Sequence, residues 1–276
     1  YRRQRQMCIR DRLDAAGWAE VTTVSRRAAG LSPLEMAQDL ASKPDNDWQD
    51  LMFGPALMQN YALSVKGGGK YSTYYNSVGY TNQDGVMKGT NYQRYTLQSK
   101  QDFKKGIFQA GTNVVLTYDQ SNPLYSVIRG GMVGHTLQAI PTWEQYDENR
   151  TGGYGGLYGD VVNLTHPLGM VDDNLMKRYS DNVKIFANAY VSVELMKGLK
   201  YKLNLTPDFQ FYRYNSYEGL FDFGLAKHDI TAVTEQQTRT RNILVENLLT
   251  FDRTFGDHKV SALVGYTYQD SRYRYM

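Results

Sequence analysis

The chain has 276 residues, of which 41% are hydrophobic and 13% aromatic, and this is enough apolar surface to exclude a disordered chain. It contains 23 Tyr and 25 Gly against 7 Pro, a balance that favours strands and tight turns over long helices. No run of about 18 apolar residues occurs, so a membrane-spanning helix is excluded. A membrane-spanning β-barrel remains open, because each of its strands needs only about ten alternating residues.

The net charge of +3 comes from one end of the chain. Residues 1–12 hold five Arg and one Asp, so the remainder carries about -1. A nucleic-acid partner is therefore not expected, because basic residues must gather on folded structure to bind a polyanion. Cys8 is the single cysteine, which excludes an intrachain disulfide and a cysteine metal cage.

The first 57 residues lack the pattern of strands. Residues 1–12 resemble translated adapter sequence, and we expect them to be a non-native or disordered tail. In the segment 13–57, Ser32, Pro33 and Glu35 form a helix start signal, which predicts a short helix that ends before Pro44. The other end stops in strand-like alternation, so we expect both ends to be cut from a longer chain.

Residues 183–195 and 199–211 predict a long hairpin. Odd positions in the first segment are apolar from Val183 to Leu195, while even positions include Lys184, Asn188 and Glu194. The second segment repeats this pattern after the turn at Met196-Lys197-Gly198. Each strand thus has one apolar face and one polar face.

Six further segments show weaker alternation, at residues 58–66, 70–81, 92–103, 107–120, 238–255 and 259–275. Several of the eight predicted strands exceed the five or six residues that are usual in soluble sandwiches. Tight turns alternate with loops of about 10, 60 and 20 residues, as in outer-membrane barrels, where short turns lie on the periplasmic side and long loops outside. The prediction is an all-β fold, an antiparallel transmembrane β-barrel segment of about eight strands.

Enzyme chemistry has little support. His135, His166, His228 and His258 are far apart and match no metal or catalytic spacing, so they are interpreted as surface polar residues. The Gly-rich stretch 152–156 lacks the Lys-Ser or Lys-Thr of a phosphate loop and is interpreted as a flexible loop tip. No catalytic residue, metal site or cofactor is predicted.

Three motifs carry a family resemblance. A D-W-x-D stretch at 47–50, an N-x-x-L-S-V-x-G-G strand at 60–68 and a G-Y-x-x-Q-x-G strand end at 79–85 occur in order. Together they closely resemble the SusC/RagA family of TonB-dependent outer-membrane transporters. The resemblance covers about residues 30–276.

This resemblance implies more than the alternation does. Members of that family are 22-stranded barrels plugged by an N-terminal domain, capped by a SusD-like lipoprotein and driven by TonB. They import oligosaccharides or peptides across the outer membrane. The present chain matches an early part of the barrel, so 13–57 is expected to be an extracellular loop and 58–276 a partial barrel whose plug region, the contact for TonB, is absent.

Four aromatic residues are candidates for substrate contact: Trp143, Tyr146, Tyr154 and Tyr158. They fall in the longest predicted extracellular loop, where flat rings could stack on sugars or pack against a peptide. The alternative is that these rings fold the loop onto itself or contact the lid.

The favoured function is part of an importer in the outer membrane, in contact with lipid and with no catalysis. The alternatives are a soluble all-β carbohydrate-binding or adhesin module, and a small enzyme on a β-scaffold.

Overall fold

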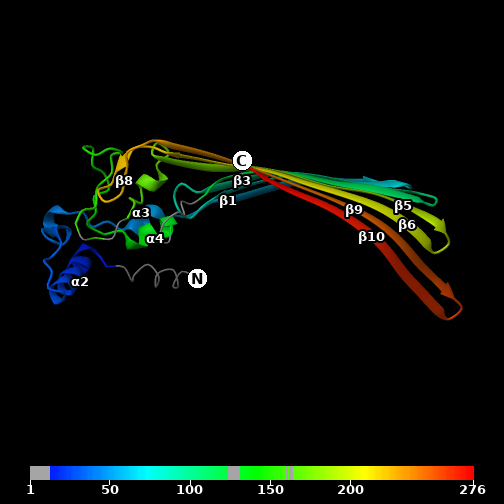
Figure 1. Cartoon of the computed structure of the whole chain (residues 1–276), viewed down its shortest axis with the longest axis horizontal. Coiled ribbons are helices and arrows are strands. Elements are labelled where there is room, and N and C mark those ends of the chain that lie inside the picture. The colour runs from blue at the N-terminus through cyan, green and yellow to red at the C-terminus, as the bar shows by residue number, and fades with distance from the viewer. Residues whose placement is uncertain (1–12, 124–130, 160, 162–163) are drawn as a thin grey trace.

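The computed structural model describes residues 13–123, 131–159, 161 and 164–276. One long antiparallel sheet dominates it, and the helices and long loops gather at one end of that sheet (Figure 1). The tail expected at residues 1–12 lies outside the described residues. None of the described helices has the length and apolar character needed to cross a membrane.

The sheet has eight strands in the order β1-β2-β3-β4-β5-β6-β9-β10, each antiparallel to its neighbours. Their bounds are β1 Met58–Gly68, β2 Ser72–Asp84, β3 Asn91–Lys105, β4 Phe108–Asn122, β5 Met176–Met196, β6 Leu199–Glu218, β9 Ala232–Phe255 and β10 His258–Tyr275. A two-stranded ribbon, β7 Phe221–Asp222 with β8 Lys227–His228, lies in the last long loop. Among the described residues β1 and β10 do not pair, so the sheet is open.

All eight predicted strands are present, and the fold class is confirmed. Most are longer than their sequence pattern indicated, because pairing continues past the regions of clear alternation. The first turn begins at Gly69 rather than Gly67, since β1 runs on to Gly68. The short turns lie at one end of the sheet and the long connections at the other, as the loop lengths predicted (Figure 1).

The helix predicted from Ser32 to Pro44 is wrong. This region forms two 3-10 turns, Glu35–Ala37 and Leu40–Ser42, because Asp39 between them adopts a left-handed backbone conformation that interrupts helical hydrogen bonding. Instead, the longest α-helix of the segment 13–57 is α2, Ala15–Ala28. Asp14 caps it by accepting a hydrogen bond from the Gly17 amide at 2.8 Å, and Arg26 and Arg27 occupy its last turn.

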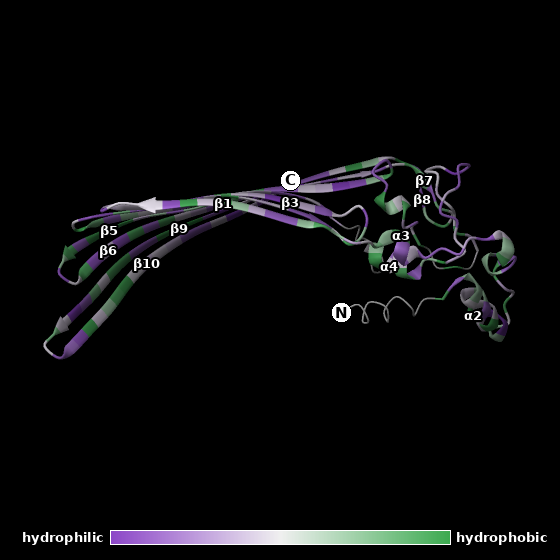
Figure 2. Cartoon of the chain, turned by 180° about the vertical axis from the view of Figure 1, so that it is seen from behind, coloured by the Kyte–Doolittle hydropathy of each residue, from purple (hydrophilic) through white to green (hydrophobic). Residues whose placement is uncertain are grey.

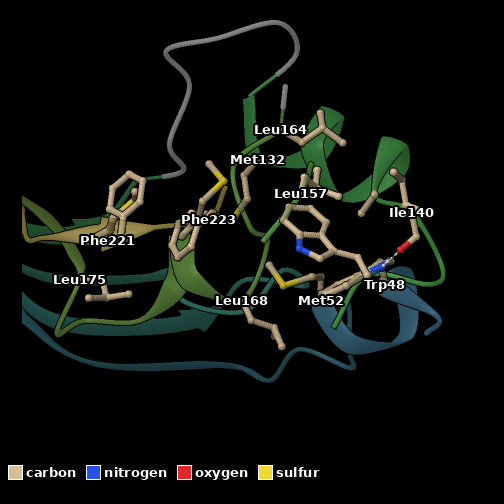
Figure 3. Close-up of a cluster of buried hydrophobic side chains, with 14 of the residues drawn as sticks. Trp48, Met52, Met132, Ile140, Leu157, Leu164, Leu168, Leu175, Phe221 and Phe223 are labelled. Carbon is tan, nitrogen blue, oxygen red and sulfur yellow. Dashed lines mark hydrogen bonds between the residues drawn. The ribbon is translucent and has the colours of Figure 1, made fainter. Parts of the chain in front are cut away.

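The other helices are short: α3 Trp48–Met52, α4 Gly131–Gln138 and the 3-10 turn η3 Gly169–Val171. They surround a cluster of buried side chains that we call the loop core (Figure 3). Its members are Trp48, Met52, Met87, Met132, Ala139, Ile140, Trp143, Leu157, Leu164, Leu168, Met170, Leu175, Met176, Phe221 and Phe223. The dry interior of this chain therefore lies in its loops, while the sheet is a single layer.

Candidate functional site

The sheet register decides which side chains share a face. Directly opposed residues lie on the same side of a sheet, and pairing is continuous from β1 to β10. Val114 on β4 thus shares a face with Ala187 on β5, and Val191 with Leu203 on β6. Figure 2 shows the resulting alternation of apolar and polar residues along the strands.

A row of four tyrosines crosses the apolar face. Tyr61, Tyr80, Tyr95 and Tyr118 are directly opposed on β1 to β4. Their ring centroids are 6.4, 4.9 and 6.3 Å apart in that order. Tyrosine rings with one polar tip are typical of the boundary between hydrocarbon and headgroups.

The distance from this row to the tight turns matches a bilayer. On β4 the apolar face runs from Phe108 at the turn to Tyr118, which is about ten residues or 33 Å along the strand. With the usual tilt of about 40°, this corresponds to a band about 25 Å high, the height of the apolar band on membrane barrels. The side chains between these two residues include the half-exposed Val114 and the exposed Leu116.

The opposite face is held by side-chain hydrogen bonds. Asn188 Nδ2 donates to Asn204 Oδ1 at 2.8 Å and to Thr206 Oγ1 at 2.7 Å. Asn204 Nδ2 in turn donates to Glu246 Oε2 at 2.8 Å, so the network spans β5, β6 and β9. Such a polar ladder suits a wall that faces water and not acyl chains.

Gly111 allows a second polar contact across three strands. It lies between Asp102 on β3 and Tyr190 on β5, and the Tyr190 hydroxyl donates to Asp102 Oδ1 at 2.8 Å across it. A Cβ at Gly111 would lie 2.5 Å from the Tyr190 ring and 2.6 Å from that carboxylate oxygen. The absence of a side chain here lets the tyrosine ring cover β4.

The loop core joins segments that are far apart in sequence. Trp48 Nε1 donates to the Ile140 carbonyl at 2.8 Å (Figure 3), and Asn46 Nδ2 donates to the Trp143 carbonyl at 2.6 Å. Trp143 Nε1 donates to the Gly155 carbonyl at 2.9 Å. Both indoles are fully buried with their polar atoms satisfied, so the long loops at this end of the sheet are tightly packed.

His166 lies at the centre of this packing. Its ring centroid is 5.1 Å from that of Trp48 and 4.7 Å from that of Trp143. Nδ1 accepts from the Gly169 amide and Nε2 lies 3.1 Å from the Glu144 carbonyl, to which it donates in the neutral tautomer. Burial lowers the pKa of His166 from 6.5 to about 4, so the ring is neutral at pH 7.

The interpretation of the histidines as surface residues is wrong for two of them. His166 is fully buried, and His135 is 3% exposed and accepts the Thr165 amide hydrogen at its Nδ1. They lie here because the loops have a core of their own, which alternation in the strands does not reveal. Among the described residues no group of three metal-ligating side chains comes together.

The four aromatic candidates divide into two pairs. Trp143 is fully buried, so its assignment to a substrate surface is wrong, and it packs the loop onto itself instead. Tyr154 packs at the margin of the loop core, where its hydroxyl donates to Asp172 at 2.9 Å and burial raises its pKa. Tyr146 and Tyr158 are 62% and 52% exposed and remain accessible.

Arg150 makes two ion pairs and a cation–π contact next to the exposed Tyr158. Arg150 Nη1 lies 3.0 Å from Asp222 Oδ1, and Arg150 Nε lies 3.2 Å from Asp147 Oδ2. The guanidinium carbon lies 4.6 Å from the Tyr158 ring centroid. Lys227 lies 2.7 Å from Asp222, and hydrogen bonding to that lysine lowers the pKa of the Asp222 carboxyl. The surface around Tyr158 therefore combines an open ring with fixed charges.

The Gly-rich stretch is packed, contrary to its interpretation as a flexible tip. The Gly155 carbonyl accepts the Trp143 indole hydrogen, and a Cβ at Gly155 would run into the Glu144 backbone. Glycine at position 155 allows the backbone there to pack directly against the backbone at Glu144.

The sequence of this chain is similar to those of several TonB-dependent receptors. TonB-dependent receptors P3 and P26 of Formosa agariphila are 29% and 26% identical over 238 and 241 residues, which is 82% and 84% of this chain. TonB-dependent receptor SusC of Bacteroides thetaiotaomicron is 26% identical over 153 residues, or 55% of the chain. The chain spans less than a quarter of these relatives, 23%, 23% and 15% of their lengths. No protein-family model matches the chain.

Solved structures show the same fold. The RagAB peptide transporter superposes with a TM-score of 0.67 at 18% identity, over 86% of this chain and 27% of that one. RagAB in its open-open state gives 0.68 at 18% identity, over 98% of this chain and 30% of that one. The open sheet has the fold of part of a RagAB-type barrel wall, and the resemblance to the SusC/RagA family is confirmed.

Proposed function

We propose that this chain forms part of the wall and outer loops of a TonB-dependent importer in the outer membrane. Residues 13–57 belong to the outer loops and 58–276 to the barrel, which would have about 22 strands when complete. The proposal is carried by the two-faced sheet, with its tyrosine row about 25 Å from the tight turns on one side and its polar network on the other. The similarity to TonB-dependent receptors supports it.

The partners in this proposal are a SusD-like lipoprotein over the loops, TonB acting through a plug domain, and membrane lipid around the wall. The cargo is an oligosaccharide or a peptide. SusC and the RagAB peptide transporter, which the chain resembles, support this class of partner and cargo. We expect no catalysis, because these relatives are named receptors and transporters.

Tyr146 and Tyr158 are the candidates for cargo contact. Both rings are exposed on a packed loop layer, so their positions are held without a ligand and little ordering is lost on binding. Trp143 in the loop core and Tyr154 at its margin belong to the packed layer that carries these two rings.

A soluble binding module fits the structure less well. A soluble sheet buries at least one face against a second layer, whereas both faces of this eight-stranded sheet lack a covering layer in the described part of the chain. Leu63, Val78, Leu97 and Leu116 are all exposed on one face, an apolar surface that suits lipid.

The test uses the intact gene product in cells with and without TonB. Uptake of a labelled oligosaccharide mixture or a labelled peptide mixture should require TonB, and Tyr146→Ala with Tyr158→Ala should weaken binding of the imported mixture about tenfold. Tyr71→Ala, an exposed tyrosine at the tight-turn end, is the matched control. Recovery of the protein in the aqueous fraction without detergent would contradict the membrane assignment.

A further inference from the structure

Four arginines face one another across the last hairpin. Arg239 is directly opposite Arg274, and Arg241 is directly opposite Arg272, in the register of β9 and β10. Asp270 is the acidic residue next to them; it pairs with Arg241 and lies 3.3 Å from Arg272. We call Arg239, Arg241, Arg272 and Arg274 the arginine quartet.

This arrangement favours an anion. Like charges directly opposite each other destabilise a strand pair, and one carboxylate offsets only part of four guanidinium charges. Arg239 and Arg274 are exposed and have no ion pair within the described part of the chain. Arg241 Nε is buried and has no hydrogen-bond partner there either. The quartet therefore offers unused donors, and guanidinium groups match phosphate with two parallel hydrogen bonds.

The quartet lies on the outward face of the wall. Arg239 and Arg241 are opposite Phe211 and Phe209 on β6, which continue the apolar face of Leu203 and Leu205. The same residues line a groove of about 620 Å³ in which the two phenylalanines meet the four arginines. A groove with an apolar side and a cationic side suits an anionic amphiphile.

The depth of the quartet matches a headgroup. On β10, Tyr268 lies about ten residues from the tight turn, as Tyr118 does on β4, and marks the level of the tyrosines. Arg272 and Arg274 lie about four and six residues further out, which is about 10 to 15 Å above that level after tilt. This exceeds the reach of a small phospholipid headgroup and suits a large phosphorylated one.

We propose that the arginine quartet binds the phosphate groups of an outer-leaflet glycolipid, with Phe209 and Phe211 beside the start of its acyl chains. This inference rests on the proposed outer-membrane location. It assigns β6, β9 and β10 as a lipid-anchoring sector of the wall, distinct from the loops that meet cargo.

The test uses the full-length protein in phosphatidylcholine vesicles that contain either phosphorylated lipid A or the same lipid A after phosphatase treatment. Native mass spectrometry of the released protein should show retained lipid A only for the phosphorylated form. Arg239→Gln with Arg274→Gln should reduce this retention at least tenfold. Lys200→Gln with Lys202→Gln removes the same charge from the polar face and should leave retention unchanged.

Each other outcome overturns the inference. Equal retention of both lipid forms would mean that acyl chains alone bind, and displacement by millimolar inorganic phosphate would indicate a free-anion site. A change in the oligomeric state of the Arg239→Gln, Arg274→Gln variant, with lipid retention unchanged, would make the quartet a protein interface. If the protein inserts into vesicles and retains no lipid A, this inference fails while the importer proposal stands; failure to insert would contradict the importer proposal itself.

Discussion

At the scale of single residues, the face of the sheet on which a side chain lies decides whether its surroundings are apolar or polar. Val114 and Val115 are neighbours on β4 with the same chemistry, yet they lie on opposite faces of the wall. Val114 is opposite Ala187 on the apolar face, while Val115 is opposite Gln98 on the polar face. The same substitution at the two positions therefore separates the effect of lipid from the effect of the side chain itself.

Val114→Arg should destabilise the full-length barrel by about 2 to 4 kcal/mol, because it places a guanidinium near the middle of the apolar band. Val115→Arg should cost much less, since the proposed barrel places this position on its hydrated inner face. Chemical unfolding in lipid vesicles, followed by tryptophan fluorescence, measures both variants. Equal destabilisation would show that the two faces are assigned wrongly.

At the scale of elements, the loops form a folded unit with its own core. The indoles of Trp48 and Trp143 lie against His166, and hydrogen bonds join residues that are 92 and 97 positions apart in the sequence. Trp48, Trp143 and His166 are fully buried, so a charge placed among them is strongly penalised. The neutral form of His166 is thus part of the packing.

The stability of the loop core should fall as the pH is lowered from about 6.5 to about 4. The pKa of His166 is lowered to about 4 by burial, so between these values the unfolded chain binds a proton that the folded loop does not. The difference of about 2.5 pH units corresponds to about 3 kcal/mol. Fluorescence of the buried tryptophans and hydrogen exchange of the loop amides in the full-length protein measure the change.

Two variants control this measurement. His166→Gln keeps one donor and one acceptor without titrating, so the pH dependence in this window should largely vanish. His258→Gln changes an exposed histidine at the tight-turn end and should retain it. A loop core whose stability is independent of pH in the unmodified protein would contradict a neutral, buried His166.

At the scale of the whole molecule, the connections are sorted by side. The four tight turns, which include Lys197-Gly198 and Gly256-Asp257, lie at one end of the sheet, and the 13-residue connection 219–231 lies with the other long loops (Figure 1). A barrel in a membrane must expose one end to the periplasm and the other to the outside. This topology can be tested without any ligand.

An epitope inserted after Ile230, which is 78% exposed, should be labelled by antibody on intact cells. The same epitope inserted after Asp257 should be labelled only after the outer membrane is permeabilised, because the proposed orientation places this turn at the periplasmic end. Heat-modifiable migration in gels confirms that both insertions leave the barrel folded. Labelling of the Asp257 insertion on intact cells would reverse the proposed orientation.

The strands were predicted well because a strand with one apolar and one polar face must alternate along the sequence. Val183 to Leu195 shows this pattern locally, and the turn at Lys197-Gly198 follows from glycine in a tight turn. The helix at Ser32 was mispredicted because its start signal is local, while the left-handed Asp39 that interrupts it is not visible in the residue pattern. Trp143 was misassigned for a related reason, since its burial depends on Trp48 and His166, which are distant in the sequence.

Strand number, the polar and apolar faces and the alternation of turns with loops thus follow from the order of residues alone, because each depends on neighbours within a few positions. The loop core, the tyrosine row and the arginine quartet depend on register, which places residues from different strands side by side. Register is set by cooperative pairing along whole strands and by packing between loops. Only the folded chain therefore shows that Arg239 faces Arg274 and that Tyr61 begins a continuous row.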